Sequence, residues 1–135
     1  MTNFKGKLEF EGDAQGAERR RAPRVDRVLD LKYRIKELPD EKTIIETLDK
    51  LLVAQSKDLS ETGICLWTTQ MLVPGSLLEV ELPAPAEGGI FQVKARVVWC
   101  RPQGGGEYVR CRCGLEFVQL TPDAQDNLLR LVRGG

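Results

Sequence analysis

A cluster of arginines near the start of the chain is the first feature that could do chemistry. Arg20 and Arg24 are separated by three residues, and Arg19 precedes them. Pro23 keeps Ala22 out of helical geometry, so we expect this run to be extended and able to wrap a ligand. Guanidinium groups are planar forks that pair with phosphate oxygens or with the O6/N7 edge of guanine. The pattern indicates a phosphate-bearing ligand, although many arginine clusters are only solvated surface.

A second motif, Asp58-Leu59-Ser60-Glu61-Thr62-Gly63, follows a predicted strand at 52–57. Asp58 and Ser60 are types that hydrogen-bond to nearby backbone in turns, and Gly63 permits a positive φ or a close approach. The Asp58 carboxylate could also accept a hydrogen bond from the ring N–H or amino group of guanine. Alone, this motif predicts only an ordinary turn. Together with the arginine run, it predicts a second part of one ligand-binding site.

The composition excludes several familiar kinds of active site. The 135 residues contain no histidine, which removes imidazole acid–base chemistry, histidine-dependent nucleophiles and imidazole metal ligands. No carboxylates or lysines are singled out as a pair by their spacing, so we expect no enzyme. The 20 basic and 20 acidic residues cancel, but residues 19–36 hold eight basic side chains against two acidic ones. A negatively charged partner would bind there.

Four cysteines remain, Cys65, Cys100, Cys111 and Cys113. The first residues lack the apolar run of a secretion signal, and no apolar run approaches the ~20 residues of a membrane span. These features predict a cytoplasmic protein with free thiols. A single residue between Cys111 and Cys113 does not suit a zinc-chelating turn. We therefore expect core cysteines, no metal and no cofactor.

Alternation of apolar and polar residues predicts most of the structure to be β-strand. It is clear in 28–35, 77–82, 91–99 and 109–117, and in 91–99 it places Trp99 on the same face as Val97. Turn residues separate these segments, as in a small antiparallel barrel or sandwich. Residues 121–132 predict a helix with Thr121 as N-cap and Pro122 in the first turn. Residues 40–50 fit either a short helix or a strand.

Taken together, the chain resembles the PilZ domain family, the bacterial receptor module for cyclic di-GMP. The resemblance covers residues 18 to about 132 and is carried by the arginine run, the motif at 58–63, Pro74-Gly75-Ser76, Ala95–Trp99, Cys113–Phe117 and the C-terminal helix. It implies one PilZ-like domain at 18–135 after a flexible lead-in at 1–17. The implied fold is mainly β, a six-stranded antiparallel barrel with a C-terminal helix and a possible short helix between the first two strands. The segment 37–50 is longer than the usual link in the family.

The resemblance also implies a function and a set of ligand contacts. The chain would be a cyclic di-GMP receptor or adaptor whose arginine loop orders over the nucleotide and changes contacts with an unidentified downstream effector. The implied ligand-binding residues are Arg19, Arg20, Arg24, Asp58, Ser60 and Gly63. In this family an arginine at the position of Arg19 accompanies an intercalated pair of ligands, so two ligands per chain are expected.

Two other binding roles compete with this interpretation. A PilZ adaptor that ignores the nucleotide would act by protein contact alone, but such members typically lack the arginines. A nucleic-acid-binding barrel would suit the basic segment, but it should present many aromatic side chains among the basic ones. Trp67 and Trp99 are candidate stacking surfaces, and large aromatics in barrels more often belong to the core. Nucleic acid is therefore not the expected partner.

Overall fold

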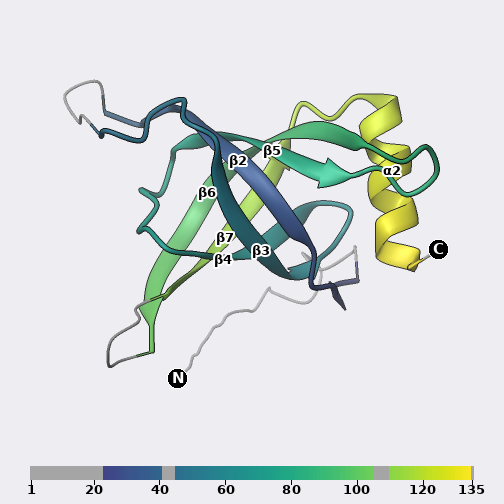
Figure 1. Ribbon diagram of the computed structural model, residues 1–135, viewed down its shortest axis with the longest axis horizontal. Helices are drawn as coiled ribbons and strands as arrows, with labels where there is room; N and C mark the ends of the chain where they lie inside the picture. The colour runs from purple at the N-terminus through teal and green to yellow at the C-terminus, as the bar shows by residue number, and fades with distance from the viewer. Residues whose placement is uncertain (1–22, 41–44, 105–109, 135) are drawn as a thin grey trace, which may run out of the picture.

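The computed structural model describes residues 23–40, 45–104 and 110–134, and in them it has seven strands and a helix (Figure 1). The elements are β1 (Val25–Asp26), β2 (Asp30–Glu37), β3 (Leu52–Leu59), β4 (Gly63–Thr68), β5 (Leu77–Pro83), β6 (Ile90–Gln103), β7 (Arg110–Val118) and α2 (Pro122–Arg133). The lead-in predicted at 1–17 lies outside the described residues.

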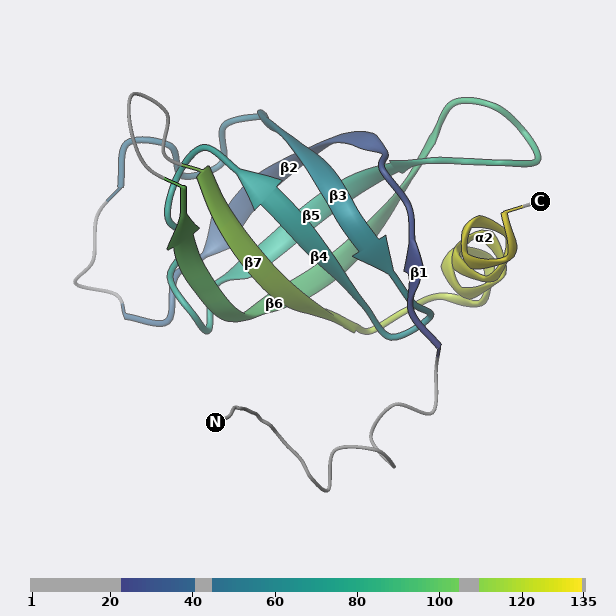
Figure 2. The ribbon, with the colours of Figure 1, turned by 90° about the horizontal axis from the view of Figure 1, so that it is seen from below.

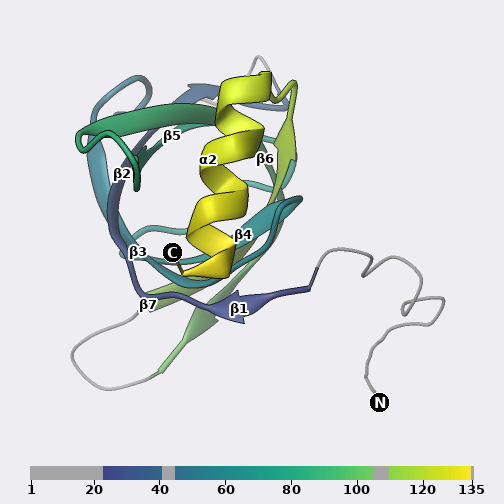
Figure 3. The ribbon, with the colours of Figure 1, turned by 90° about the vertical axis from the view of Figure 1, so that its right-hand side faces the viewer.

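Six of the strands form a closed antiparallel barrel. The strand order is β1-β3-β2-β5-β6-β7-β4, and a further pairing of β3 with β4 closes the ring. The short strand β1 lies outside the ring and pairs with the end of β3 (Figure 2). Helix α2 lies across one end of the barrel (Figure 3). The predicted six-stranded barrel with a C-terminal helix is confirmed.

The barrel interior is filled by the residues that alternation predicts. In β5, Leu78, Val80 and Leu82 are fully buried while their neighbours are less so. Tyr33 and Ile35 of β2 join them in the same core. Because successive side chains of a strand point to opposite faces, each strand places every second residue inside the ring.

The alternation fails in β4, which the sequence did not reveal as a strand. Ile64, Cys65 and Leu66 are all buried in succession. Ile64 and Leu66 face the core, whereas Cys65 faces outward into a hollow lined by Asp58 and Trp99. A strand covered on both faces carries no period-two pattern, so it cannot be read from hydropathy alone.

Residues 45–51 form neither the possible short helix nor the alternative strand that the sequence allowed between the first two strands. They form turns, and Leu48 makes an isolated bridge with Ile35 of β2. The Asp49 backbone N–H donates to the Ile35 carbonyl at 2.9 Å. This part of the long link therefore folds along β2, and residues 41–44 lie outside the described ranges.

A β-bulge in β6 overturns the predicted orientation of Trp99. The β6–β7 register shifts between Val97, opposite Leu115, and Trp99, opposite Gly114. The extra residue, Val98, is 57% exposed. Because one inserted residue reverses the parity of a strand, Trp99 lies on the outer face instead of sharing the inner face with Val97.

Helix α2 begins at the cap that its sequence predicts. The Thr121 hydroxyl accepts from the Ala124 backbone N–H at 3.1 Å, and Gly134 closes the helix with a φ of 71°. At the C-terminal end, Arg27 donates to the carbonyls of Leu131 and Val132 at 3.0 and 3.1 Å. This arginine of the basic segment therefore contacts the helix rather than the predicted ligand site.

The expectation of free thiols is wrong for two of the four cysteines. Cys100 and Cys113 face each other across β6 and β7 and form a disulfide, with Cα atoms 4.1 Å apart. Cys65 and Cys111 are free and buried. Within the described residues, no cluster of acidic or cysteine side chains is arranged to hold a metal ion, and no helix is long and apolar enough to cross a membrane.

Candidate functional site

Strand β1 brings the end of the arginine run to the Asp58 motif. Asp26 lies opposite Asp58 in the antiparallel pairing of β1 and β3, and Arg24 directly precedes β1. The Nη1 atom of Arg24 donates to the Asp58 Oδ1 atom at 2.7 Å. Two motifs separated by 34 positions in the sequence thus meet in one ion pair.

The Asp58 carboxylate lies between two cationic groups. Its Oδ2 atom is 3.6 Å from the Lys57 Nζ atom, whereas Arg24 binds its Oδ1 atom. The side chain is 17% exposed, whereas that of Arg24 is 46% exposed. A carboxylate has about four acceptor positions, so Asp58 can hold the guanidinium in place and still accept from a bound molecule.

The turn after β3 is held together by Ser60. The Ser60 hydroxyl oxygen accepts from the backbone N–H groups of Thr62 and Gly63, both at 3.1 Å. The Ser60 N–H donates to the Gly63 carbonyl at 2.9 Å. Ser60 is 1% exposed, and its hydrogen bonds shape the turn. A direct contact between Ser60 and a ligand stays a prediction.

Gly63 is required by close packing. A Cβ atom at this position would lie 2.5 Å from the Leu115 carbonyl oxygen and 3.4 Å from the Arg24 Nη2 atom. Any side chain would therefore push β4 away from β7 or displace the arginine. Gly63 keeps the surface beside Arg24 low and open.

Two adjoining hollows flank Arg24, and Trp99 lines both of them. One has a volume of about 200 Å³ and includes Thr62 and Gly63 in its wall. The other has a volume of about 220 Å³ and includes Asp58 and Lys57. Residues from both motifs therefore line a pair of hollows that share Arg24, Trp99 and Gly114, and together we call these hollows the depression at Arg24.

Trp99 is enclosed by arginines and packs over a glycine. Its ring lies over Gly114 on β7, where an added Cβ would meet three ring atoms. The guanidinium carbons of Arg101 and Arg112 are 5.4 and 5.6 Å from the ring centroid, within the range of cation–π attraction. The site thus combines a flat aromatic surface with concentrated positive charge.

Arg112 carries an unsatisfied donor. Its buried Nε atom has no hydrogen-bond partner among the described residues, and its side chain lines the hollow that also contains Asp58. A buried N–H without a partner is costly. An acceptor group that entered this hollow would remove that cost.

The thiol of Cys65 lies in the same hollow but is not reactive. Burial, together with the nearby negative charge of Asp58, raises the pKa of Cys65 to about 11. The thiol therefore stays protonated near neutral pH, and only a thiolate is a strong nucleophile. Cys65 contributes packing to the site.

Among the predicted ligand residues, the structure brings together Arg24, Asp58, Ser60 and Gly63. Arg19 and Arg20 lie outside the described residues. The sequence names Trp99 only as a candidate stacking surface and does not predict Arg112 at the site. A signal was present in Gly114, because a glycine inside a strand pattern indicates a close approach by another group.

Comparisons with known proteins agree with this architecture. A family model described as PilZ domain matches residues 18–134. The PilZ domain of YcgR from Escherichia coli, with c-di-GMP, is similar at a TM-score of 0.60 and 18% identity, over 86% of this chain and 90% of that chain. A PilZ domain of CeSA from a cellulose-synthesizing bacterium has a TM-score of 0.52 at 14% identity, over 83% and 96%.

A longer protein is also similar. The inhibitor of motility MotI (DgrA) from Bacillus subtilis has a TM-score of 0.58 at 21% identity, over 85% of this chain and 50% of that one. The present chain thus spans half the length of MotI. Among curated protein sequences, none matches. Because the family model matches most of the chain, from residue 18 to residue 134, this protein belongs to the PilZ domain family.

Proposed function

We propose that this protein is a cyclic di-GMP receptor that acts as an adaptor and not as an enzyme. The observation that carries the proposal is the ion pair between Arg24 and Asp58 at the edge of a depression walled by Trp99. The similar domain of YcgR carries c-di-GMP. That likeness supports the same class of ligand here.

The chemistry of the depression suits a cyclic dinucleotide of guanine. Such a ligand has two phosphates and two planar bases with exposed donor and acceptor edges. Arg24, together with Arg19 and Arg20 of the preceding loop, supplies guanidinium groups for phosphates and guanine edges. Trp99 offers a face on which a base can stack, and Asp58 offers an acceptor for guanine N–H groups.

The arginine loop is the element proposed to transmit the signal. Residues 19–24 carry four arginines and no large apolar side chain. Phosphates would relieve the repulsion among these arginines and let the loop close over the ligand. The closed loop would present a different surface to a downstream effector, which is how a module without catalytic chemistry can pass on a signal.

Calorimetric titration of the full chain with cyclic di-GMP tests the proposal. Arg24→Ala and Arg20→Ala should each weaken binding at least tenfold, because each removes charge-assisted hydrogen bonds that contribute about 1.5–3 kcal/mol. Arg130→Ala is a matched control, since Arg130 lies on α2 and pairs with Asp126 at 3.2 Å. Unchanged binding by both loop variants, or no binding by the wild type, would refute the assignment.

The stoichiometry of the same titration tests the predicted pair of ligands. We expect two ligands per chain for the wild type and fewer for Arg19→Ala, because a third guanidinium would hold the second ligand. One ligand per chain for both proteins would refute the paired arrangement while leaving the receptor assignment intact.

A further inference from the structure

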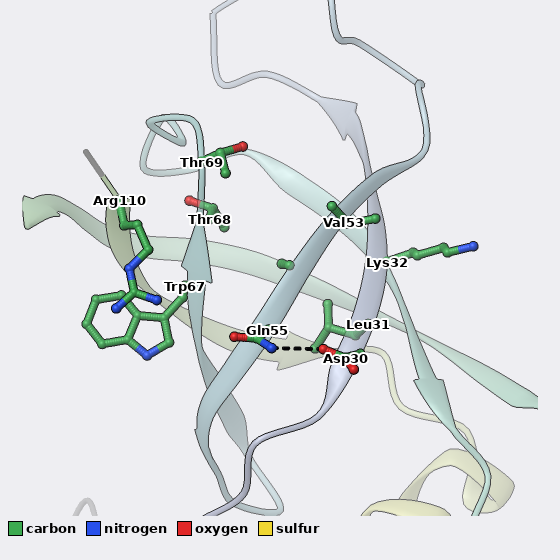
Figure 4. A pocket seen from close by; sticks show the side chains of 10 residues that line it. Asp30, Leu31, Lys32, Val53, Gln55, Trp67, Thr68, Thr69 and Arg110 are labelled. Atoms are coloured by element: carbon green, nitrogen blue, oxygen red, sulfur yellow. Dashed lines mark hydrogen bonds between the residues drawn. The ribbon is translucent and has the colours of Figure 1, made fainter. Parts of the chain in front are cut away.

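The barrel wall has an opening between β3 and β4, the two strands whose pairing completes the ring. The ladder between β3 and β4 extends from Leu59 opposite Ile64 to Gln55 opposite Trp67. Strand β3 begins three residues earlier, at Leu52. Where the two strands separate, a pocket of about 400 Å³ lies between them (Figure 4).

The pocket leads from the outer surface to the barrel core. Its deep wall contains Leu31, Ala54 and Thr68, which are at most 9% exposed and belong to the inner face. Its rim contains Val53, 66% exposed, and the indole of Trp67. An open apolar pocket with a bulky aromatic rim is the kind of recess that receives an anchoring side chain at interfaces.

Exposed apolar side chains continue from the pocket around this end of the barrel. Five of the eight large apolar residues that are exposed in the described part of the chain come from 48–53 and 71–73, namely Leu48, Leu51, Val53, Met71 and Val73. A hydrogen bond of 3.2 Å from Gln70 to Thr47 ties the two segments together. This apolar rim lies at the end of the barrel away from α2 (Figure 1). Clustered exposed apolar side chains mark interaction surfaces.

One side of the pocket is strongly basic. The guanidinium carbon of Arg110 lies 4.4 Å from the Trp67 ring centroid, and Figure 4 shows the two groups stacked. Arg112 is opposite Trp67 in the β4–β7 ladder, and Arg101 is opposite Arg112 in the β6–β7 ladder. On the other side, the Asp30 carboxylate accepts from the Gln55 amide at 2.9 Å. Arg110 lines the pocket, and Arg112 on β7 and Arg101 on β6 continue from it as a basic strip across the neighbouring strands.

We propose that this pocket and rim are the docking site for a partner protein segment in which a bulky apolar residue is flanked by acidic residues. The apolar side chain enters the pocket between Val53 and Trp67, and the acidic residues lie along the basic strip. The charge pattern disfavours a second copy of this chain, because a two-fold contact through the same patch brings like charges together. The pocket shares no lining residue with the two hollows at Arg24, so the apolar side chain can enter it while the nucleotide site is filled, although the basic strip extends to Trp99 of that site.

A selection of random peptides displayed on phage, with the full chain as target, supplies an unbiased probe. We expect enriched sequences to place Leu, Ile, Met, Phe or Trp beside Asp or Glu. Synthetic copies of the enriched peptides, labelled with a fluorophore, then report affinity by anisotropy. Selections that return no such pattern would overturn the proposal.

Variants of the chain locate the bound peptide. Val53→Asp should weaken binding at least tenfold, because a charge would enter the apolar pocket. Ile90→Asp is the matched control, since Ile90 is 59% exposed and lies at the start of β6, outside the rim. Arg110→Glu should weaken binding of the acidic peptide and strengthen binding of a copy in which lysines replace the acids. Equal binding by wild type and Val53→Asp would overturn the proposal.

Two further measurements separate the competing explanations. Circular dichroism and cyclic di-GMP titration should be unchanged in Val53→Asp, which excludes unfolding and keeps this test independent of the nucleotide site. Sedimentation should give the same monomer for wild type and Val53→Asp. A wild-type dimer that Val53→Asp dissociates would instead assign the rim to a second copy of this chain and refute the proposed partner.

Discussion

The indole of Trp99 lies over Gly114, its neighbour on β7, at a position where no side chain could fit beneath it. The contact exists because the bulge at Val98 turns Trp99 outward. It sets the ring as one wall of the depression that holds Arg24 and Asp58. The shape of the proposed nucleotide site therefore depends on a glycine that never needs to touch the ligand.

Gly114→Ala should weaken cyclic di-GMP binding by displacing the Trp99 ring. Trp99→Ala should weaken it to a similar extent, and the double variant should be no worse than either single one, because both changes remove the same surface. Calorimetry measures the three affinities, and thermal unfolding monitors the fold. Fully additive losses would show that the two residues act separately.

Asp58→Ala should weaken binding and reduce the preference for guanine over adenine. Adenine has no N–H at ring position N1, so a carboxylate at that edge discriminates against it. Competition between cyclic di-GMP and cyclic di-AMP measures the preference, and circular dichroism checks the turn that Ser60 holds. If the variant excludes cyclic di-AMP as strongly as the wild type does, Asp58 serves only to position Arg24.

Arg112→Ala should weaken binding more than Arg101→Ala, although both guanidinium groups lie near Trp99. The reason is the buried Nε atom of Arg112, which has no partner among the described residues and would gain one from an acceptor group of the ligand. The two titrations form a matched pair because each variant loses one stacked cation. Equal losses would mean that stacking and general charge explain the effect of both.

Arg27→Ala should destabilise the fold and leave ligand binding unchanged. Arg27 donates to the Leu131 and Val132 carbonyls at the end of α2, and such charge-assisted bonds contribute about 1–3 kcal/mol in total. Urea unfolding measures the loss, and cyclic di-GMP titration below the transition tests binding. Weaker binding without a change in stability would place Arg27 in the ligand site instead.

Ionisation of the buried Tyr33 phenol should lower the free energy of unfolding at alkaline pH. Burial in the barrel, with a smaller contribution from Cys111, raises the pKa of Tyr33 from 10.0 to about 12. The folded state therefore favours the neutral phenol. Its contribution to stability is complete below the unfolded pKa of about 10 and is lost, at about 1.4 kcal/mol per pH unit, as the pH rises towards 12.

Urea unfolding between about pH 8 and pH 11 measures this alkaline loss. Tyr33→Phe should flatten the decline, because phenylalanine has no phenol to ionise. Cys65 adds a second, earlier contribution, because burial also raises its pKa, from 9.0 to about 11. A slope unaffected by Tyr33→Phe would show that other groups control the alkaline transition.

Much of this fold follows from local sequence patterns. The alternation in 77–82 places Leu78, Val80 and Leu82 inside, and the structure agrees. The cap at Thr121 and the apolar face of α2 predict the helix and its buried side. The two motifs at 20–24 and 58–63 identify the family, which the match over residues 18–134 confirms. Each of these signals depends only on near neighbours in the chain.

The remaining features depend on which strands meet. The bulge that turns Trp99 outward is defined by the register between β6 and β7, and no residue in β6 predicts its position. The role of Arg27 depends on the last turn of α2, where it contacts carbonyls that are 104 and 105 positions away in the sequence. The pocket beside Trp67 exists because β3 and β4 separate beyond Gln55. The sequence by itself determined the strand periodicity, the helix and the family, because these are written in local spacing. Only the tertiary structure decided which side chains share a surface, because the packing of distant segments sets those contacts.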